Sequence, residues 1–337
     1  MEKTVQRKSL KSRNRNLSPL VLFLFSILAI YVIIFLFMLV WAFMNSFKPL
    51  GQWEDRQYMQ LPDYSNPLWT TKEMRYNMQG NQVMSTYYPS AFANYTRVIE
   101  AMPGESGARF YAGWNLDTAM TKTYQNTIFS MVFNTIVYSL VGSAIIAVVP
   151  CVVGYLAAKY PYKFSSLLYV LTLFVMIMPI VGSDPARIKL LCRLYLYDTM
   201  WGDFIVNFTF ANMYFLVFYA FYSGVSGTYA EAAEVDGASQ LRTMIQIIMP
   251  LASKMIMTVL LIYFIGRWNN YATPLIYLPN KWMISYRLYM ITIYKDEVGG
   301  DPAKIAGAMV IVVPILILFI LLRNQIMGNI SIGGIKE

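Results

Sequence analysis

Histidine is absent from this chain of 337 residues, and cysteine occurs only twice, at Cys151 and Cys192. Without an imidazole the chain lacks the commonest general base, the commonest metal ligand and every Ser-His or Cys-His nucleophile pair. Neither cysteine has a C-x-x-C neighbour, so we interpret both as packing residues. The sequence therefore excludes histidine-based catalysis, and we expect neither a catalytic site nor a metal site.

Charged residues are scarce, at 13% of the chain, whereas hydrophobic residues make up 57% and the mean hydropathy is +0.45. This composition is far more apolar than that of a soluble domain. The net charge of +9 does not indicate a nucleic-acid partner, because six of the 27 basic residues precede the first apolar run. By the positive-inside rule this basic tail predicts a cytoplasmic N-terminus. The six residues are Lys3, Arg7, Lys8, Lys11, Arg13 and Arg15.

Long apolar runs recur along the chain, and about 20 such residues suffice to span a bilayer as helix. We predict an all-α membrane protein with six transmembrane helices and both termini in the cytoplasm. The first run is too long for a signal peptide, so we expect it to stay as an anchor. The six expected spans are 18–45, 128–158, 165–182, 204–223, 254–271 and 305–322.

The expected division of the chain follows from these spans. A basic cytoplasmic tail (1–17) and the first transmembrane helix (18–48) come before an enlarged extracytoplasmic segment (49–125). A five-helix core (126–323), which includes a cytoplasmic loop at 224–253, precedes a cytoplasmic tail (324–337). The extracytoplasmic segment is near-neutral and rich in tyrosine, asparagine and methionine. We expect it to pack as a small cap and to add a contact with a solute-binding protein.

The cytoplasmic loop is a polar island between apolar runs. Thr228-x-x-Glu231 fits a capping box, which predicts a short helix starting at residue 229. Gly237 then permits a sharp bend. A second helix is expected to follow and to end at Pro250. Its apolar residues have the spacing of one helical face: Leu241, Met244, Ile245 and Ile248.

The loop resembles the EAA signature of permease subunits of bacterial ABC importers. The matching residues are Glu231-Ala232-Ala233, Gly237 and Ile248-Met249-Pro250, where the family usually has leucine in place of Met249. The resemblance implies that Glu231, Ala232, Ala233, Gly237 and Pro250 dock onto an ATPase subunit. No G-x-x-x-x-G-K-[ST] phosphate cradle occurs in the chain, so ATP and Mg²⁺ would be bound by that partner and this chain would hold no cofactor.

Three further stretches resemble the carbohydrate-uptake branch, the maltose-type permeases. They are Phe92-Ala93-Asn94-Tyr95, the segment from Trp268 to Leu275, and a glycine-rich tail from Gly328 to Lys336. In that family the tail extends toward the ATPase interface, which implies such a role for Gly328, Gly333, Gly334 and Lys336. The partners implied are a homologous second permease subunit, an ATP-binding subunit dimer, an extracytoplasmic solute-binding protein and the lipid bilayer. The implied location is a bacterial cell membrane.

Arg267 follows a charge-free stretch near the outer end of the fifth expected span. An arginine inside a membrane usually faces a cavity or a partner, which suggests that Arg267, Trp268, Asn269 and Asn270 line a solute path. The more common alternative is that Arg267 snorkels to the outer interface. A glycerol-phosphate-type solute, with Arg267 as its anion contact, also stays open.

Two other classes of protein remain as alternatives. An autonomous secondary transporter or channel predicts a buried ionisable relay or inverted halves, and the sequence shows neither. A membrane enzyme needs an acid–base cluster, for which histidine is missing. Uptake without an ATPase would favour the first of these, and turnover by the purified chain would favour the second.

Overall fold

The computed structural model describes residues 19–65, 71–76, 82–87, 92–110, 120–160, 162–178, 182–293 and 301–327. Most of this is helical, as expected, but the all-α prediction is wrong for the segment between the first two long helices. There β1 (Thr71–Tyr76) pairs antiparallel with β2 (Gln82–Tyr87), and β3 (Gly104–Phe110) pairs antiparallel with β4 (Met120–Asn126). Threonine and tyrosine are frequent in these strands, and both favour extended backbone.

Three helices of the described residues are long and apolar enough to cross a membrane, where six spans were predicted. They are α1 (Pro19–Ser46), α4 (Ile128–Lys159) and α15 (Asp301–Met327). A fourth arises if residues 240–251 and α12 (Ser253–Asn269), which meet at a bend of 72°, count as one span. The apolar helices α5 (Lys163–Ile177) and α8 (Met213–Gly224) are shorter than a full span.

The fourth expected span, 204–223, is broken into two helices. The short helix α7 (Met200–Val206) ends first, and α8 begins after Asn212. The Asn212 side chain accepts hydrogen bonds from the backbone N–H groups of Tyr214 and Phe215, at 2.9 and 3.3 Å. An asparagine in this position starts a new helix, so the apolar run is interrupted where hydropathy alone suggested continuity.

Helix α4 is the spine of the bundle and contributes to three buried clusters along its length. Near its start Met131 packs with α3 (Ala93–Ala101), α14 (Ile284–Ile293) and α15. Further along, Tyr138 packs with α6 (Asp184–Arg193), α13 (Ala272–Tyr277) and α14. Toward its end Cys151 packs with α8 and α12, and its thiol lies 3.1 Å from the Tyr222 hydroxyl.

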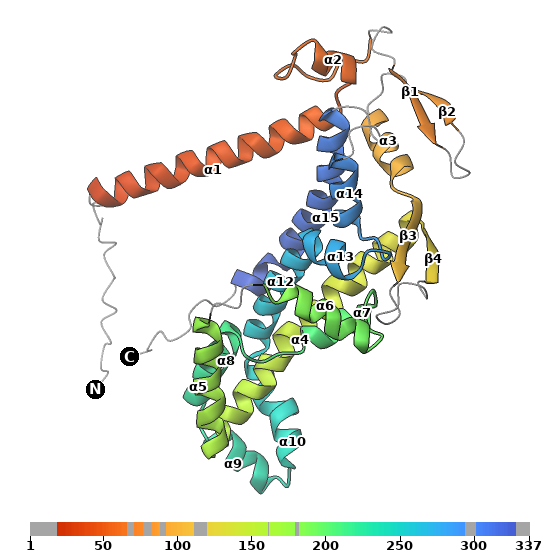
Figure 1. Cartoon of the computed structure of the whole chain (residues 1–337). Helices are drawn as coiled ribbons and strands as arrows, with labels where there is room; N and C mark the ends of the chain where they lie inside the picture. Colours follow the sequence, from red (N-terminus) through yellow and green to blue (C-terminus); the bar gives the residue numbers. More distant parts are fainter. Residues whose placement is uncertain are drawn as a thin grey trace, which may run out of the picture.

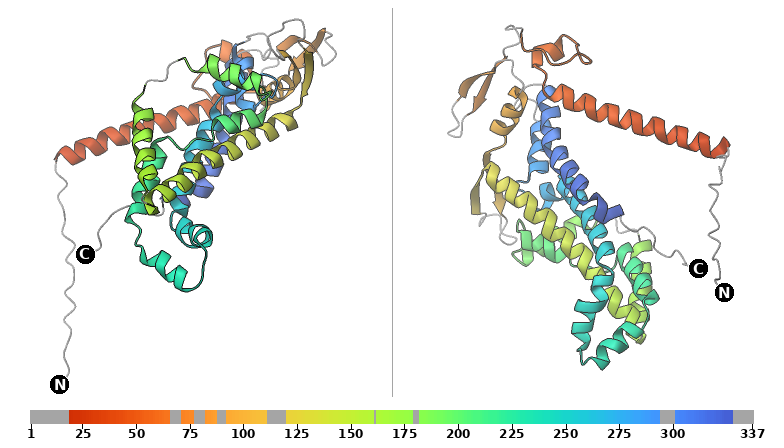
Figure 2. Two further views of the ribbon diagram at one scale, coloured as in Figure 1. Left: turned by 60° about the horizontal axis from the view of Figure 1, so that its bottom comes forward. Right: turned by 180° about the vertical axis from the view of Figure 1, so that it is seen from behind.

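The two ends of the bundle differ in structure (Figures 1 and 2). The hairpins, α2 (Leu50–Glu54) and α3 lie at one end, and α9 (Thr228–Val235) and α10 (Gln240–Arg242) lie at the other. Helix α1 points away from the bundle and meets α15 near its own C-terminal end (Figure 1). Nearly all its apolar side chains are exposed, which requires lipid or another chain around them.

The Phe92-Ala93-Asn94-Tyr95 stretch ties α3 to the end of α1. The amide nitrogen of Asn94 donates to the carbonyls of Ser46 and Lys48, at 2.9 and 2.7 Å. The Tyr95 hydroxyl lies 2.8 Å from the Ser46 hydroxyl. Because these groups are buried, the hydrogen bonds fix the exit of the chain from its first long helix.

A buried aspartate holds the short helices of the hairpin end together. Asp198, between α6 and α7, accepts hydrogen bonds from the backbone and side-chain nitrogens of Asn280, both at 3.1 Å. Burial raises the pKa of the Asp198 carboxyl, and the bonds from Asn280 oppose that shift. The segment before α14 is thereby joined to the segment before α7.

Candidate functional site

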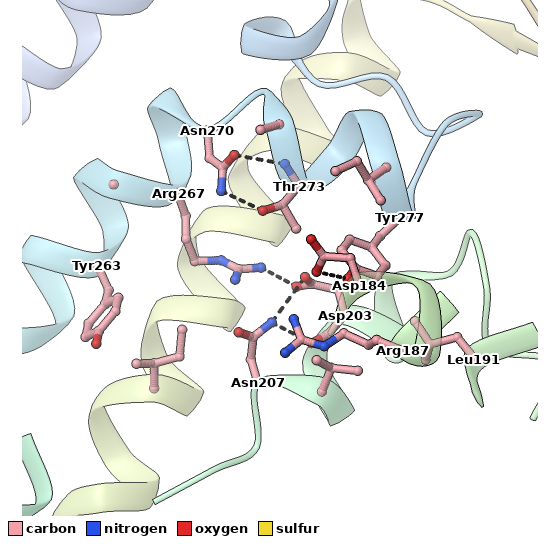
Figure 3. Close-up of a pocket in the computed structure, with 15 residues that line it drawn as sticks. Asp184, Arg187, Leu191, Asp203, Asn207, Tyr263, Arg267, Asn270, Thr273 and Tyr277 are labelled. Carbon is pink, nitrogen blue, oxygen red and sulfur yellow. Dashed lines mark hydrogen bonds and ion pairs between the residues drawn. The ribbon is translucent and has the colours of Figure 1, made fainter. Parts of the chain in front are cut away.

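A cavity of about 540 Å³ lies beside the C-terminal end of α12, between α6, α7 and α13. We call it the arginine pocket (Figure 3). The aliphatic part of its wall comes from α4, α6, α7 and α13. Its polar wall is formed by Asp184, Arg187, Asp203, Asn207, Tyr263, Arg267, Asn270, Thr273 and Tyr277.

Arg267 is buried, with 7% of its surface exposed, and three groups hold it. Its guanidinium forms an ion pair with Asp203. Its Nε donates to the carbonyl of Tyr138 at 2.9 Å, and its Cζ lies 3.9 Å above the centre of the Tyr138 ring. A buried pair with hydrogen bonds and an aromatic face is the arrangement that keeps an arginine charged away from water.

Gly142 on α4 provides the space for this guanidinium. A β-carbon built on Gly142 would lie 2.3 Å from Arg267 Cζ and Nε, closer than real contacts allow. Any other residue type would displace the arginine or the helix. Because Gly142 has no side chain, the Arg267 guanidinium of α12 can lie against the backbone of α4.

The interpretation that Arg267 snorkels to the interface is wrong, because the side chain turns inward to Asp203. Asp203 was not singled out from the sequence, because it lies 64 residues away from Arg267 along the chain. That aspartate directly precedes the apolar run at Phe204. A charge at the edge of a run was the available signal.

The four predicted path residues are not brought together. Arg267 and Asn270, three residues apart, line the arginine pocket. Asn269 lines a different cavity of about 230 Å³. The Trp268 indole donates to the carbonyl of Ile311 at 3.2 Å and so packs α12 against α15. A solute path for these residues stays a prediction, and a single cavity accounts for only two of them.

Several pocket residues were not singled out from the sequence. The Tyr277 hydroxyl donates to Asp184 Oδ1 at 2.6 Å, and burial is the main reason why the pKa of Tyr277 is raised. The Asn207 amide donates to Asp203 Oδ1 at 3.1 Å. Arg187 extends toward this group from α6 (Figure 3). Their charges lie in short helices between apolar runs, a signal that marks the region but not the geometry.

The second candidate region is the α9–α11 loop, residues 228–251, which includes the π-helical segment η3 (Thr243–Ile248) and α11 (Met249–Leu251). The predicted capping box is wrong. Helix α9 has Gly227 as its N-cap without a side-chain hydrogen bond, and Thr228 is its first residue. The Thr228 hydroxyl instead lies 2.9 Å from the Ser226 hydroxyl.

The predicted bend at Gly237 is confirmed by its backbone. Its φ is +76°, the left-handed region that favours glycine. The N–H of Gly237 donates to the carbonyl of Glu234 at 2.9 Å, and that of Ala238 donates to Ala233 at the same distance. Of the predicted docking residues, Glu231, Ala232, Gly237 and Pro250 are exposed, whereas Ala233 is buried under the loop.

The predicted apolar face of the second helix is confirmed for Ile248, which is buried, and for Met244, which packs against the same cluster, but is wrong for Leu241 and Ile245. Residues 243–248 form a π-helix, whose hydrogen bonds join residues five apart. The buried positions are accordingly Thr243 and Ile248, while Leu241 and Ile245 are 63% and 52% exposed. The helical segment also continues one residue past Pro250 before the bend into α12.

The predicted tail residues Gly328, Gly333, Gly334 and Lys336 lie outside the described residues. At the loop end, a cavity of about 460 Å³ separates α9 from the end of α4, and Glu231, Glu234 and Lys159 contribute to its wall. The Lys159 ammonium donates to the carbonyl of Val225, where α8 ends. The loop is thus attached to α4 through the chain that leads into it.

The apolar helices α4 and α12 border a polar cavity, and an exposed loop lies at one end of the bundle. The profile of the family described as "Binding-protein-dependent transport system inner membrane component" matches residues 150–331, more than half of the chain. The chain belongs to this family.

Two permease proteins are similar to this chain in sequence, and one solved structure is similar to it in fold. The arabinooligosaccharides transport system permease protein AraQ of Bacillus subtilis is 23% identical over 208 residues, which cover 62% of this chain and 74% of AraQ. The sulfoquinovosyl glycerol transport system permease protein SmoH of Agrobacterium fabrum is 21% identical over 207 residues, 60% of this chain and 72% of SmoH. A bacterial ABC transporter involved in the import of the acidic polysaccharide alginate aligns with a TM-score of 0.63 at 18% identity, covering 90% of this chain and 95% of that chain. At that identity the likeness shows the fold alone.

Proposed function

We propose that this chain is a permease subunit of an ATP-driven ABC importer for a sugar or oligosaccharide, and that it forms half of the translocation path. The proposal rests on the family membership, because that family serves binding-protein-dependent transport. Its sugar specificity is supported by the names of the similar permeases, AraQ among them. The assembly would contain a homologous second permease, two ATP-binding subunits and an extracytoplasmic solute-binding protein.

The α9–α11 loop is the proposed contact with the ATP-binding subunit, through Glu231, Ala232, Gly237 and Pro250, with Ala233 supporting them from below. Its exposed surface supports this role. Within the described part of the chain, Glu231, Glu234 and Asp236 form no salt bridge. An acidic, partly apolar surface without a partner in its own chain is suited to a basic partner surface.

The arginine pocket, at the end of α12 opposite the loop, is the proposed part of the solute path. Its amides, hydroxyls and charged groups suit the hydroxyls of a sugar. The N- and C-termini and the loop would then be cytoplasmic, and the hairpins extracytoplasmic. The tail of Gly328, Gly333, Gly334 and Lys336 keeps its predicted role at the ATPase interface.

Coupling requires that the ATPase subunits bind two states of the bundle with different free energies. ATP and Mg²⁺ would be held by those subunits, whose closure moves the loop and thereby switches the bundle between inward-open and outward-open states. Hydrolysis would reset the cycle. In this scheme the chain performs no chemistry itself.

Reconstitution into liposomes tests the proposal. The complete complex is supplied with its binding protein and with the solute identified in that protein. It should take up this solute only when ATP is present on the side of the membrane that carries the ATPase subunits. The same liposomes without ATPase subunits should show no uptake. Uptake by the permeases alone would favour the secondary transporter, and a bound solute that is not a sugar would refute the sugar specificity.

The buried Arg267–Asp203 pair is one observation in favour of a secondary transporter, because such transporters use buried ionisable groups. The pair, however, is internally neutralised, and Asp203 has a second donor in Asn207. A relay needs a group that exchanges its proton. The geometry therefore favours a structural anchor, and the liposome assay separates the two.

A further inference from the structure

One cation of the arginine pocket differs from the other. Arg187 lies on α6, one turn after Asp184 and one turn before Leu191. Leu191 is buried in the cluster with Tyr138, which anchors this face of α6 against the bundle. Arg187 is thereby held at the cavity wall, with its guanidinium beside Asp203 and Asn207 (Figure 3).

The other charged groups of the pocket already have strong partners. Arg267 is neutralised by Asp203 and donates to the Tyr138 carbonyl. Asp203 also accepts from Asn207, and Asp184 accepts from the Tyr277 hydroxyl at 2.6 Å. Arg267 and Asp203 thus neutralise each other, whereas Asp184 is bound by an uncharged hydroxyl and keeps acceptor capacity for a solute hydroxyl.

Arg187 has no carboxylate partner of this kind. Its guanidinium interacts with the uncharged Tyr277 hydroxyl, including by a hydrogen bond, and with Asp203, which is already paired with Arg267. Within the described residues Arg187 forms no salt bridge. It is also exposed, so its N–H donors face the cavity without the cost of a buried unpaired charge.

The remaining pocket groups restrict the ligand further. Beside Arg267, Asn270 and Thr273 bond each other twice, at 2.9 and 3.0 Å, so this part of the wall is polar but uncharged. Of the two arginines in this wall, Arg187 is therefore the one without a carboxylate partner among the described residues. A planar guanidinium presents parallel N–H groups that fit the two oxygens of a carboxylate.

We propose that Arg187 binds a carboxylate of the transported sugar, so that the solute is a uronic-acid-containing oligosaccharide. Ring hydroxyls would be left to Asp184 and Asn207 at the same wall. This inference rests on the proposed function, since it assigns a chemical class to the solute of that path. It also transfers the role of anion contact, first considered for Arg267, to Arg187.

Uptake by the reconstituted complex with its binding protein tests this assignment, with two disaccharides as probes. Digalacturonate carries the carboxylates, and galactobiose is the neutral match. We expect the wild-type complex to take up digalacturonate in preference to galactobiose. Arg187→Gln should raise the KM for digalacturonate about tenfold to a hundredfold, as expected for the loss of a charge-assisted hydrogen bond, and change the KM for galactobiose much less.

Two further variants separate recognition from folding. Arg187→Lys keeps the charge but not the fork, and should fall between wild type and Arg187→Gln. Arg193→Gln, an exposed arginine in the last turn of the same helix and outside the pocket, should behave as wild type. An equal loss for both probes in Arg187→Gln would mean a structural role and would overturn the assignment.

The outcomes also distinguish this inference from the function beneath it. Preference for galactobiose, insensitive to Arg187→Gln, would refute the acidic solute and leave the sugar importer standing. Uptake of neither probe would refute the acidic disaccharide as well. The importer itself would then be judged by ATP-driven uptake of whatever solute its binding protein carries.

Discussion

The arginine pocket and the α9–α11 loop are both polar regions between apolar runs, but they differ in the burial and pairing of their charged side chains. In the pocket, Arg267 and Asp203 are buried and paired with each other. In the loop, three carboxylates of one sign are exposed within the same short segment. A buried charge must find its partner in its own chain, because water is not there to replace it. An exposed cluster is solvated by water, so its partner can be supplied by another protein.

The difference extends to how each region is shaped. Side-chain contacts from α4, α7 and α12 fix the pocket, so many residues share in its geometry. Backbone features shape the loop: the left-handed Gly237 and the π-helical segment from Thr243 to Ile248. We therefore expect substitutions in the pocket to change the stability of the bundle, and substitutions in the loop to change association with little effect on the bundle.

Asp203→Ala should have the largest effect. It leaves Arg267 buried without its carboxylate, which costs about 3–5 kcal/mol of the free energy of unfolding. Thermal unfolding in detergent, followed by tryptophan fluorescence, measures the loss. The double variant Asp203→Leu/Arg267→Met removes both charges and should recover much of it. A single variant as stable as wild type would mean that water reaches the arginine.

Gly142→Ala should come next. The added methyl group occupies the position of the Arg267 guanidinium, and such overpacking costs about 1–3 kcal/mol of the free energy of unfolding. Gly266→Ala is the matched control, since it is also a helical glycine and no atom lies within 4 Å of its β-carbon. That control should be neutral or stabilising by up to about 1 kcal/mol. Equal effects of the two would contradict the close approach of Arg267 to α4.

Gly237→Ala tests the other side of the comparison. A β-carbon in the left-handed region costs about 1–2 kcal/mol. At Gly237 we expect this cost to distort only the exposed bend. Affinity for the ATP-binding subunit, measured by co-purification and by titration, should fall several-fold while the melting temperature of the bundle changes little. Gly237→Asn should bind better than Gly237→Ala, because asparagine tolerates this backbone.

Gly224→Ala provides the control for that experiment. It lies before the loop, has no left-handed backbone and has open space around its β-carbon. It should bind the ATP-binding subunit as wild type does. If Gly237→Ala also bound normally and supported normal uptake, the docking role proposed for the loop would be wrong.

The sequence could predict features that depend on neighbouring residues. The helix at 19–46, the long helices α4 and α15 and the bend at Gly237 follow from apolar runs and from glycine itself. The position of Asp203 beside Arg267 depends on how two distant helices cross, which no local pattern encodes. The π-helical segment also was not predicted, and its last residue, Ile248, packs into the cluster around Cys151, which is formed by residues far apart in the sequence.

The smallest predicted effect concerns how helices begin in the two regions. Thr228 was predicted to cap α9, but its hydroxyl contacts Ser226, and both residues are exposed. Thr228→Ala should therefore change the free energy of unfolding by less than about 0.5 kcal/mol.

Asn212 caps α8 inside the bundle by accepting from two backbone N–H groups. Asn212→Ala should therefore lower the free energy of unfolding by about 0.5–2 kcal/mol. Melting curves of the two variants, with Asn212→Asp as a cap-preserving control, measure the contrast. Equal losses would support the predicted capping box at Thr228. They would mean that side chains of the loop stabilise its structure, as side chains of the pocket do.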